Sequence, residues 1–265
     1  MAQPTERCEP PVLISSSMNP DLLIYKNSEL LSNAAAEYFT AVAADAVASR
    51  GSFIAALSGG STPKALFSLL AGPTYRGKID WQAVHLFWGD ERLVPADDAG
   101  SNYYHVQHIL LSQVPIPPAQ VHRVRGELPP KQAADDYTAQ LRESAPTGRA
   151  WPRFDLALMG LGADGHTASL FPGSTAVIEE ERPVVVVTAD YAGRPAQRVT
   201  LTPPVFNSAR RILFLVTGKE KATALSAVLR GPKDVQKWPA QSIQPVSGSL
   251  TWFADRAAAS QLGPL

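Results

Sequence analysis

The glycine-rich stretch Gly160–Ser174, GLGADGHTASLFPGS, combines residue types that are suited to acid–base chemistry. His166 lies two residues after Asp164, and the stretch follows an apolar run that predicts a strand. An imidazole titrates near neutral pH, so it can take a proton from water and return it to a leaving group. We therefore expect His166 to act as a general base and Asp164 to orient its ring. A buried structural histidine is the alternative.

The same stretch also matches the dinucleotide fingerprint G-x-G-x-x-G through three glycines: Gly160, Gly162 and Gly165. Asp190 even lies at about the spacing of a ribose-binding acid. The fingerprint needs a long helix, however, and Pro172 follows too soon to allow one. Asp164 would also repel a pyrophosphate. We therefore favour glycines that present His166, and expect Gly162 and Gly165 to border a substrate pocket.

A second candidate site is the segment SGGSTP, Ser58–Pro63, between a predicted strand and a predicted helix. Glycines allow a tight turn with exposed N–H groups, hydroxyls add donors, and the helix start adds a positive dipole end. This combination predicts a phosphate-binding loop formed by Gly59, Gly60, Ser61 and Thr62. The Walker pattern is absent, so a phosphate monoester is the expected ligand. A tight strand-to-helix turn with a Ser/Thr cap fits the motif equally well.

A charged run, WGDERLVP, follows another predicted strand at Trp88–Pro95. Ligands bind beyond the carboxyl ends of parallel strands. Three charged residues would lie at such an end: Asp90, Glu91 and Arg92. Taken alone, such a run is more often a solvated turn with an ion pair. Further along, Arg198 and Lys221 would neutralise a phosphate if their strands neighbour the Gly59–Thr62 loop.

Apolar segments alternate between strand and helix periodicity, which predicts βαβ units and a mostly parallel sheet covered by helices on both faces. We expect a loosely attached tail over residues 1–20 and one α/β domain over residues 21–265. The predicted strands are Asp21–Tyr25, Ser52–Leu57, Val84–Trp88, Val121–Val124, Phe154–Met159, Val184–Val187 and Ile212–Thr217. The predicted helices are Glu29–Ser49, Pro63–Leu70, Asn102–Leu111, Lys131–Glu143, Glu220–Leu229 and Trp252–Gln261.

Composition narrows the classes of partner. The chain has 24 basic and 24 acidic residues, so no basic excess favours nucleic acid or an anionic membrane. No apolar run reaches the ~18 residues of a membrane span, and no signal-peptide pattern opens the sequence. The single cysteine, Cys8, cannot form an internal disulfide. We expect a small-molecule substrate, no nucleic acid, no membrane and a cytoplasmic location.

Other catalytic patterns are missing from the sequence. The histidines form neither H-x-H nor H-E-x-x-H, so no metal is expected. There is no G-x-S-x-G elbow for a serine nucleophile. In any hydrolysis, we expect the nucleophile to be water activated by His166, without a cofactor.

Six motifs, taken in the order in which they occur along the chain, resemble those of the 6-phosphogluconolactonase family. The matching segments are SGGSTP from Ser58, WGDERLV from Trp88, GLGADGHTASLFP from Gly160, RVTLT from Arg198, GKEKA from Gly218 and LTWFADRAA from Leu250. The resemblance covers residues 21–262, and the block around His166 is its most specific part.

The resemblance implies an α/β fold with a Rossmann-like open sheet of the glucosamine-6-phosphate deaminase and ribose-5-phosphate isomerase type. It also implies hydrolysis of 6-phosphoglucono-1,5-lactone in the oxidative pentose phosphate pathway, and we expect a monomer or weak homodimer. His166 would be the general base. The implied phosphate ligands are Gly60, Ser61, Thr62, Arg198 and Lys221. The implied edge of the sugar site is Arg92 with Asp90 and Glu91.

Two positions distinguish the chain from glucosamine-6-phosphate deaminases. Those enzymes carry a carboxylate five residues after the histidine, where this sequence has Phe171. Their D-E-Y motif is D-E-R here, with Arg92 in place of tyrosine. Both differences favour a lactonase. A deaminase-like isomerase, a nicotinamide-dependent dehydrogenase and a non-catalytic sugar-phosphate-binding module are the alternatives.

Overall fold

The computed structural model describes residues 12–16, 19–189, 193 and 195–263 of the 265-residue chain. Within these residues, an eight-stranded sheet runs in the order β1-β2-β11-β10-β7-β3-β4-β6. All of its pairs are parallel except β1–β2, so the predicted mostly parallel sheet is confirmed. Its strands are β1 (Val12–Ser16), β2 (Asn19–Tyr25), β3 (Phe53–Leu57), β4 (Val84–Trp88), β6 (Val121–His122), β7 (Leu156–Gly160), β10 (Arg211–Val216) and β11 (Ser249–Asp255).

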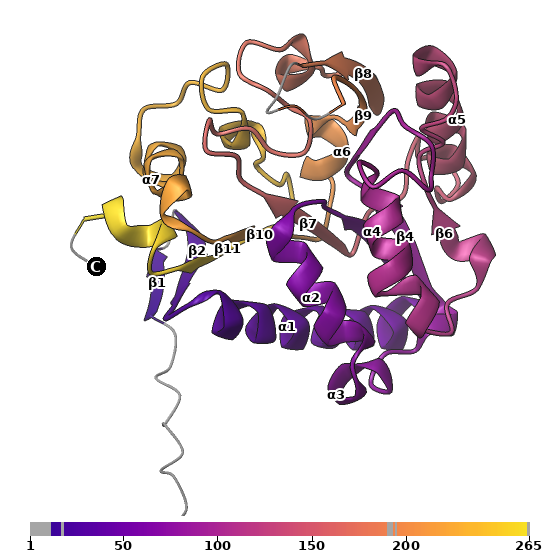
Figure 1. The fold of residues 1–265 in the computed structure, drawn as a ribbon, viewed down its shortest axis with the longest axis horizontal. Helices are drawn as coiled ribbons and strands as arrows, with labels where there is room; N and C mark the ends of the chain where they lie inside the picture. Colours follow the sequence, from indigo (N-terminus) through magenta and orange to yellow (C-terminus); the bar gives the residue numbers. More distant parts are fainter. Residues whose placement is uncertain (1–11, 17–18, 190–192, 194, 264–265) are drawn as a thin grey trace, which may run out of the picture.

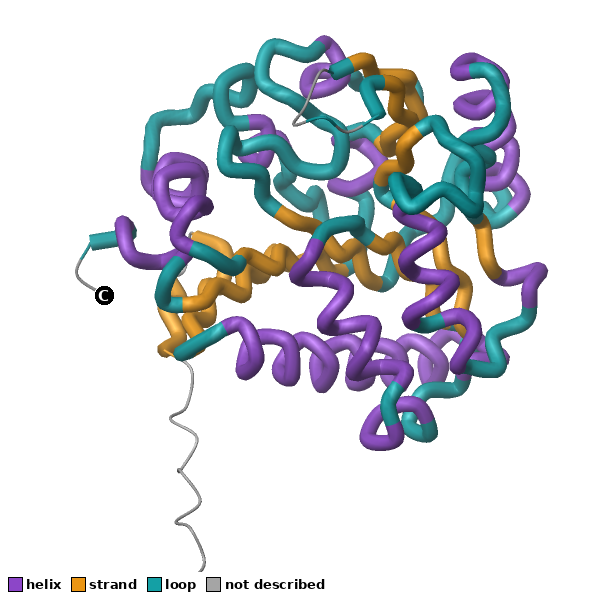
Figure 2. The backbone as a smooth tube through the Cα atoms, in the orientation of Figure 1, coloured by secondary structure: helices purple, strands orange, loops and turns teal. Residues whose placement is uncertain are grey.

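Helices cover both faces of this sheet, as Figures 1 and 2 show. One face packs on α1 (Ser28–Arg50), α2 (Ser61–Ala71), α3 (Pro73–Arg76) and α4 (Asn102–Ile109). The other belongs to the hydrophobic cluster that contains α5 (Pro130–Glu143), α6 (Pro203–Asn207) and α7 (Ala222–Arg230). Buried strand residues divide between the two: Phe214 joins the α5–α7 cluster, whereas Leu213 joins the α1–α4 cluster. The predicted two-sided covering is therefore confirmed.

Local sequence accounts for the longest helix. Asn27 accepts the Leu30 N–H at its start, and Gly51, at a φ of 77°, ends it. Short 3-10 turns link the other elements: η1 (Trp81–Ala83), η2 (Leu111–Gln113), η3 (Pro118–Gln120), η4 (Thr175–Ile178), η5 (Lys219–Lys221), η6 (Pro239–Ser242) and η7 (Ala258–Gln261). None of the described helices combines the length and apolar character needed to cross a membrane.

A second, antiparallel sheet lies beside the main one. It has three strands, β5 (Asp90–Arg92), β9 (Gln197–Leu201) and β8 (Val184–Thr188). The strand expected at Val184–Val187 is therefore present, but it does not join the parallel sheet. The charged run after β4 forms strand β5, which pairs with β9 and so brings together two segments that are distant in sequence.

Two predictions about the chain ends are corrected by the structure. The helix predicted over Trp252–Gln261 is wrong, because β11 lies between β10 and β2 in the sheet. Trp252 and Phe253 are buried in opposite clusters, the alternation of a strand. The tail predicted over residues 1–20 is also too long, because Val12–Ser16 pairs antiparallel with β2. Residues 1–11 lie outside the described range.

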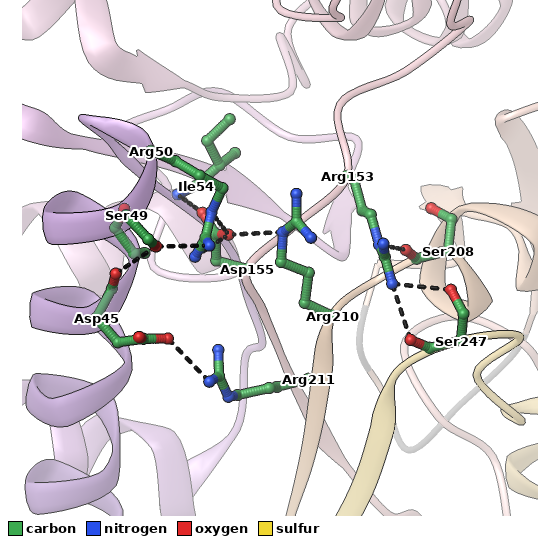
Figure 3. Close-up of polar contacts among 11 residues, drawn as sticks. Asp45, Ser49, Arg50, Ile54, Arg153, Asp155, Ser208, Arg210, Arg211 and Ser247 are labelled. Carbon is green, nitrogen blue, oxygen red and sulfur yellow. Dashed lines mark hydrogen bonds and ion pairs between the residues drawn. The ribbon is translucent and has the colours of Figure 1, made fainter.

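Buried Asp155 joins four segments at the amino ends of the central strands (Figure 3). Its carboxylate accepts the Ile54 N–H at 2.9 Å and contacts Arg50 at 3.0 Å and Arg210 at 3.2 Å. These partners come from β3, the end of α1 and the residue before β10. The network ties helix and sheet together at the edge opposite to the carboxyl ends.

Candidate active site

A cleft of about 480 Å³ lies at the carboxyl ends of the parallel strands, large enough for a small ligand. Its lining follows β3, β4, β7, β10 and β11 and includes β9 of the small sheet. The predicted residues that line it are Gly59, Gly60, Ser61, Thr62, Asp90, Arg92, Gly162, His166, Arg198 and Lys221. Glu91, Asp164 and Gly165 do not line it.

The Gly59–Thr62 segment forms the expected loop between β3 and α2. Gly60 has a φ of 110° and precedes a helix start that no side chain caps. A Cβ on Gly59 would lie 2.1 Å from the Asn102 side-chain oxygen, so a larger residue does not fit there. The Thr62 and Thr217 hydroxyls lie 2.7 Å apart and join this loop to the end of β10. Uncapped helix N–H groups at a cleft favour an anion.

Three cationic side chains line the same cleft as this loop: Arg92, Arg198 and Lys221. Arg92 and Arg198 are direct cross-strand partners in β5 and β9. Like charges placed opposite each other in a sheet are destabilising, and a bound anion relieves the repulsion. Arg198 is only 3% exposed, and Arg92 donates to the Gly100 carbonyl at 2.6 Å. Together with Lys221 from η5, they make the cleft suited to a phosphate group.

His166 and Asp164 form the expected couple. The Nδ1 atom of His166 lies 2.6 Å from Asp164 Oδ1, and the imidazole side chain is 16% exposed. Partial burial acts to raise the pKa of Asp164, but the hydrogen bond and charge of His166 outweigh it and lower that pKa below its usual value. A Cβ on Gly162 would lie 2.0 Å from His166 Nδ1. Gly162 is therefore the residue that makes room for the imidazole.

The backbone just after His166 is held at several points. Thr167 donates to the Gly160 carbonyl at 2.8 Å, and Ser169 donates to the buried Asp90 carboxylate at 2.6 Å. Between them, Ala168 lines the cleft with a φ of 48°, a conformation that residues with a Cβ rarely adopt. Ser169 was missed by the sequence analysis, although it lies within the most specific motif. Strain at a cleft is a common feature of functional sites.

Glu91 and Gly165 support the walls of the cleft. Glu91 accepts the N–H groups of Asn102 and Tyr103 at 2.7 Å and caps the start of α4. Burial raises the pKa of the Glu91 carboxyl above its usual value, although these hydrogen bonds act in the opposite direction. Gly165, at a φ of 83°, packs on Trp238. The alternative of a solvated turn at Asp90 and Glu91 is wrong, because both are buried.

The described residues lack the helix that a dinucleotide-binding site requires after its glycines. Between Gly160 and Ser174 there is no helix, only turns and a bridge between Thr167 and Leu170. Asp190, its candidate ribose ligand, lies outside the described residues. Among the described residues, no group of three histidine, cysteine, aspartate or glutamate side chains is arranged as a metal site.

The parallel sheet with helices on both faces defines a Rossmann-like α/β fold, and a cleft with a histidine–aspartate couple lies at the carboxyl ends of its strands. The family model for glucosamine-6-phosphate isomerases/6-phosphogluconolactonase matches residues 26–252. The chain belongs to this family, which confirms the resemblance seen in its motifs.

Relatives within the family agree with the lactonase resemblance. A 6-phosphogluconolactonase from Synechocystis is 39% identical over 250 residues, covering 93% of this chain and all of that protein. A 6-phosphogluconolactonase from Haemophilus influenzae is 39% identical over 202 residues, covering 76% of this chain and 84% of that protein. The solved 6-phosphogluconolactonase from Trypanosoma brucei superposes with a TM-score of 0.82 at 30% identity, covering 93% of this chain and 100% of that one. The prediction of a 6-phosphogluconolactonase-type enzyme is therefore confirmed.

A solved monomeric glucosamine-6-phosphate deaminase shares the fold at a TM-score of 0.77 but only 21% identity. It covers 91% of this chain, and 99% of its own length is matched. The likeness confirms the fold type named from the sequence and carries no argument about activity.

Proposed function

We propose that the chain hydrolyses 6-phospho-D-glucono-1,5-lactone to 6-phospho-D-gluconate in the oxidative pentose phosphate pathway. The observation that carries the proposal is one cleft that has the glycine-rich loop and uncapped start of α2 at one part and a histidine–aspartate couple at another. The names of the close relatives support the substrate. We assign the activity to a single α/β domain, residues 21–265.

In the proposed binding mode, the 6-phosphate accepts hydrogen bonds from the start of α2 and is neutralised by Arg198 and Lys221. This anchoring directs the other end of the substrate, the lactone carbonyl, toward His166. Arg92, with its neighbour Asp90, borders the sugar ring. Holding the carbonyl beside His166 in this way lowers the entropic part of the activation barrier, because the reacting groups are already oriented.

The proposed chemistry is general base catalysis. Asp164 binds Nδ1, so Nε2 of neutral His166 accepts a proton from water as the water oxygen attacks the carbonyl carbon. Arg92 or a backbone N–H of the Gly160–Gly165 loop stabilises the oxyanion. The carbonyl re-forms as the bond from carbon to the ring oxygen breaks, and His166 returns the proton to that oxygen.

Phe171 favours this reaction over the deaminase alternative. Its ring lies 4.8 Å from the His166 ring, centroid to centroid, and it holds the sequence position at which the deaminase motif has a carboxylate. A phenylalanine can neither accept nor donate the proton that sugar ring opening needs. An aromatic ring against the His166 imidazole therefore supports the lactonase over the deaminase.

The direct test is an assay on freshly generated 6-phosphogluconolactone, compared with its spontaneous hydrolysis in the same buffer. We expect the protein to accelerate the appearance of 6-phosphogluconate strongly, and glucosamine 6-phosphate to remain unchanged. A rate equal to the spontaneous one would refute the proposal, and ammonia release from glucosamine 6-phosphate would replace it by the deaminase function.

A further inference from the structure

Phe171 contacts two functional side chains that come from different parts of the fold. Its ring lies 4.8 Å from the His166 ring at an angle of 36°. The Arg198 guanidinium carbon lies 5.4 Å from the same ring centroid. The phenylalanine side chain is 7% exposed, so it lies beneath the cleft surface and does not line the cleft.

The backbone around Phe171 is fixed on both sides. The Leu170 N–H donates to the Thr167 carbonyl at 2.9 Å, and the Ser174 N–H donates to the Phe171 carbonyl at 3.0 Å. The Gly173 N–H donates to Gln236, a residue in a distant loop, at 2.8 Å. The ring therefore has a defined place relative to the sheet.

His166 and Arg198 come from different segments, so a shared contact is needed to fix their positions relative to each other. His166 belongs to the loop after β7, whereas Arg198 belongs to β9 of the small sheet. The hydrogen bond to Asp164 restrains one edge of the imidazole, and packing on Phe171 restrains the tilt of its plane. An aromatic face attracts a guanidinium through its quadrupole and packs favourably on a second ring.

We propose that Phe171 is a positioning residue that sets the separation between the general base and the phosphate anchor. The inference rests on the proposed function, in which His166 activates water and Arg198 holds the 6-phosphate. Substrate fixed at Arg198 presents its carbonyl correctly only if the imidazole has a constant place relative to that arginine. A displacement of about 1 Å in such a geometry is enough to cost about 10²-fold in rate.

The test compares Phe171→Leu, which removes the aromatic face, with Phe171→Tyr, which keeps it. Phe154→Leu is the matched control, because Phe154 is fully buried in the same cluster and does not line the cleft. For Phe171→Leu we expect kcat to fall about 10–100-fold and KM to rise severalfold. Phe171→Tyr should recover most of both constants. Phe154→Leu should lower the melting temperature while leaving both constants within about twofold of the wild type.

Two further measurements do not depend on turnover. The ring current of Phe171 should shift the His166 ring protons in NMR spectra, assigned by their loss in His166→Gln; this shift should vanish in Phe171→Leu and persist in Phe171→Tyr. Inorganic phosphate should bind more weakly to Phe171→Leu than to wild type. Unchanged phosphate affinity and unchanged kcat in a folded Phe171→Leu would overturn the inference. An inactive wild type would overturn the proposed function instead, and the NMR and phosphate measurements would still decide the role of Phe171.

Discussion

His166 is held in the cleft by partners that lie close to it in the chain. Asp164 binds its Nδ1 atom, Gly162 leaves the space that a Cβ would fill, and Ala168 takes a strained φ of 48°. A left-handed conformation costs a residue with a Cβ about 1–2 kcal/mol. The hydrogen bonds of Thr167 and Ser169 on either side of Ala168 offset this cost. At the residue scale, the position of the His166 imidazole is therefore set by residues within a few positions of it in the sequence.

Replacing His166 by alanine removes the proposed base. We expect kcat for lactone hydrolysis to fall by about 10²–10⁴-fold, because general base catalysis contributes a factor of that order. Steady-state assays corrected for spontaneous hydrolysis measure this fall, and a melting curve shows whether the variant is folded. Near wild-type turnover in a folded variant would remove His166 from the mechanism.

Arg198→Ala should act mainly on substrate binding. The loss of a charged hydrogen-bond donor to the phosphate should raise KM by about 10–100-fold, with a smaller change in kcat. Arg198→Lys keeps the charge and serves as the matched variant, with a smaller rise expected. An unchanged KM in both variants would show that the phosphate binds elsewhere.

Asp164 introduces a pH dependence of stability. Its folded pKa is lower than the value of 3.8 for the free side chain, so its ionised form stabilises the fold above that value. The contribution is lost as the pH falls through the folded pKa. Because the Asp164 side chain is 37% exposed, solvent screening keeps the effect small.

We therefore expect Asp164→Asn to melt about 2 °C below wild type at pH 7, with a difference that narrows as the pH falls below 3.8 and through the folded pKa. Scanning calorimetry across this range measures the gap. The exposed Asp97, replaced by asparagine, is the control and should show no such gap. A gap that widens toward low pH would contradict the sign of the pKa shift.

At the scale of elements, the two edges of the parallel sheet have separate roles. The carboxyl ends carry the loops of the cleft, where β5 and β9 add Arg92 and Arg198 from the side. The amino ends carry Asp155 and its arginine partners, which hold α1 against the sheet (Figure 3). This separation allows stability and activity to be altered independently.

Asp155→Ala tests the network at the amino ends. It leaves the Ile54 N–H and two partly exposed arginines without their acceptor, so we expect a loss of about 2 kcal/mol in the free energy of unfolding. Asp45→Ala is the control: its ion pair with Arg211 is more exposed and should contribute less than about 0.5 kcal/mol. Chemical denaturation measures both, and equal effects would contradict a special role for Asp155. The KM of Asp155→Ala should stay unchanged.

At the scale of the whole molecule, a bound sugar phosphate would connect segments that the fold brings together from across the chain. The cleft joins the start of α2, the small sheet and η5, and the Thr62–Thr217 contact already links the start of α2 to the end of β10, just before η5. Ligand binding should therefore stabilise the folded state as a unit.

We expect 6-phosphogluconate at 100 times its dissociation constant to add about 2.7 kcal/mol to the free energy of unfolding and to raise the melting temperature by several degrees. Differential scanning fluorimetry measures this shift. NAD and NADP should leave the melting temperature unchanged, because the helix of a dinucleotide site is missing after Gly165. Stabilisation by a dinucleotide alone would revive the dehydrogenase alternative.

Most parallel strands could be predicted because each is a short apolar run bounded by glycine, proline or charge, as at Ser52–Leu57. The prediction failed at β11, where the aromatic and alanine residues after Ser249 also suit a helix. The segment forms a strand because it pairs with β10 on one side and β2 on the other, which are contacts that local sequence does not reveal. The small sheet was missed for the same reason, since pairing between β5 and β9 is a long-range choice.

The amino-acid sequence by itself determined the parts of the site that depend on near neighbours. The Asp164–His166 couple, the glycines that admit it and the loop before α2 follow from spacings of a few residues, over which backbone geometry is local. Tertiary structure alone decided that Arg92 lies opposite Arg198, that Thr62 meets Thr217 and that Phe171 contacts both His166 and Arg198. Those contacts join residues far apart in the chain, and strand pairing and core packing, which act through space, bring them together.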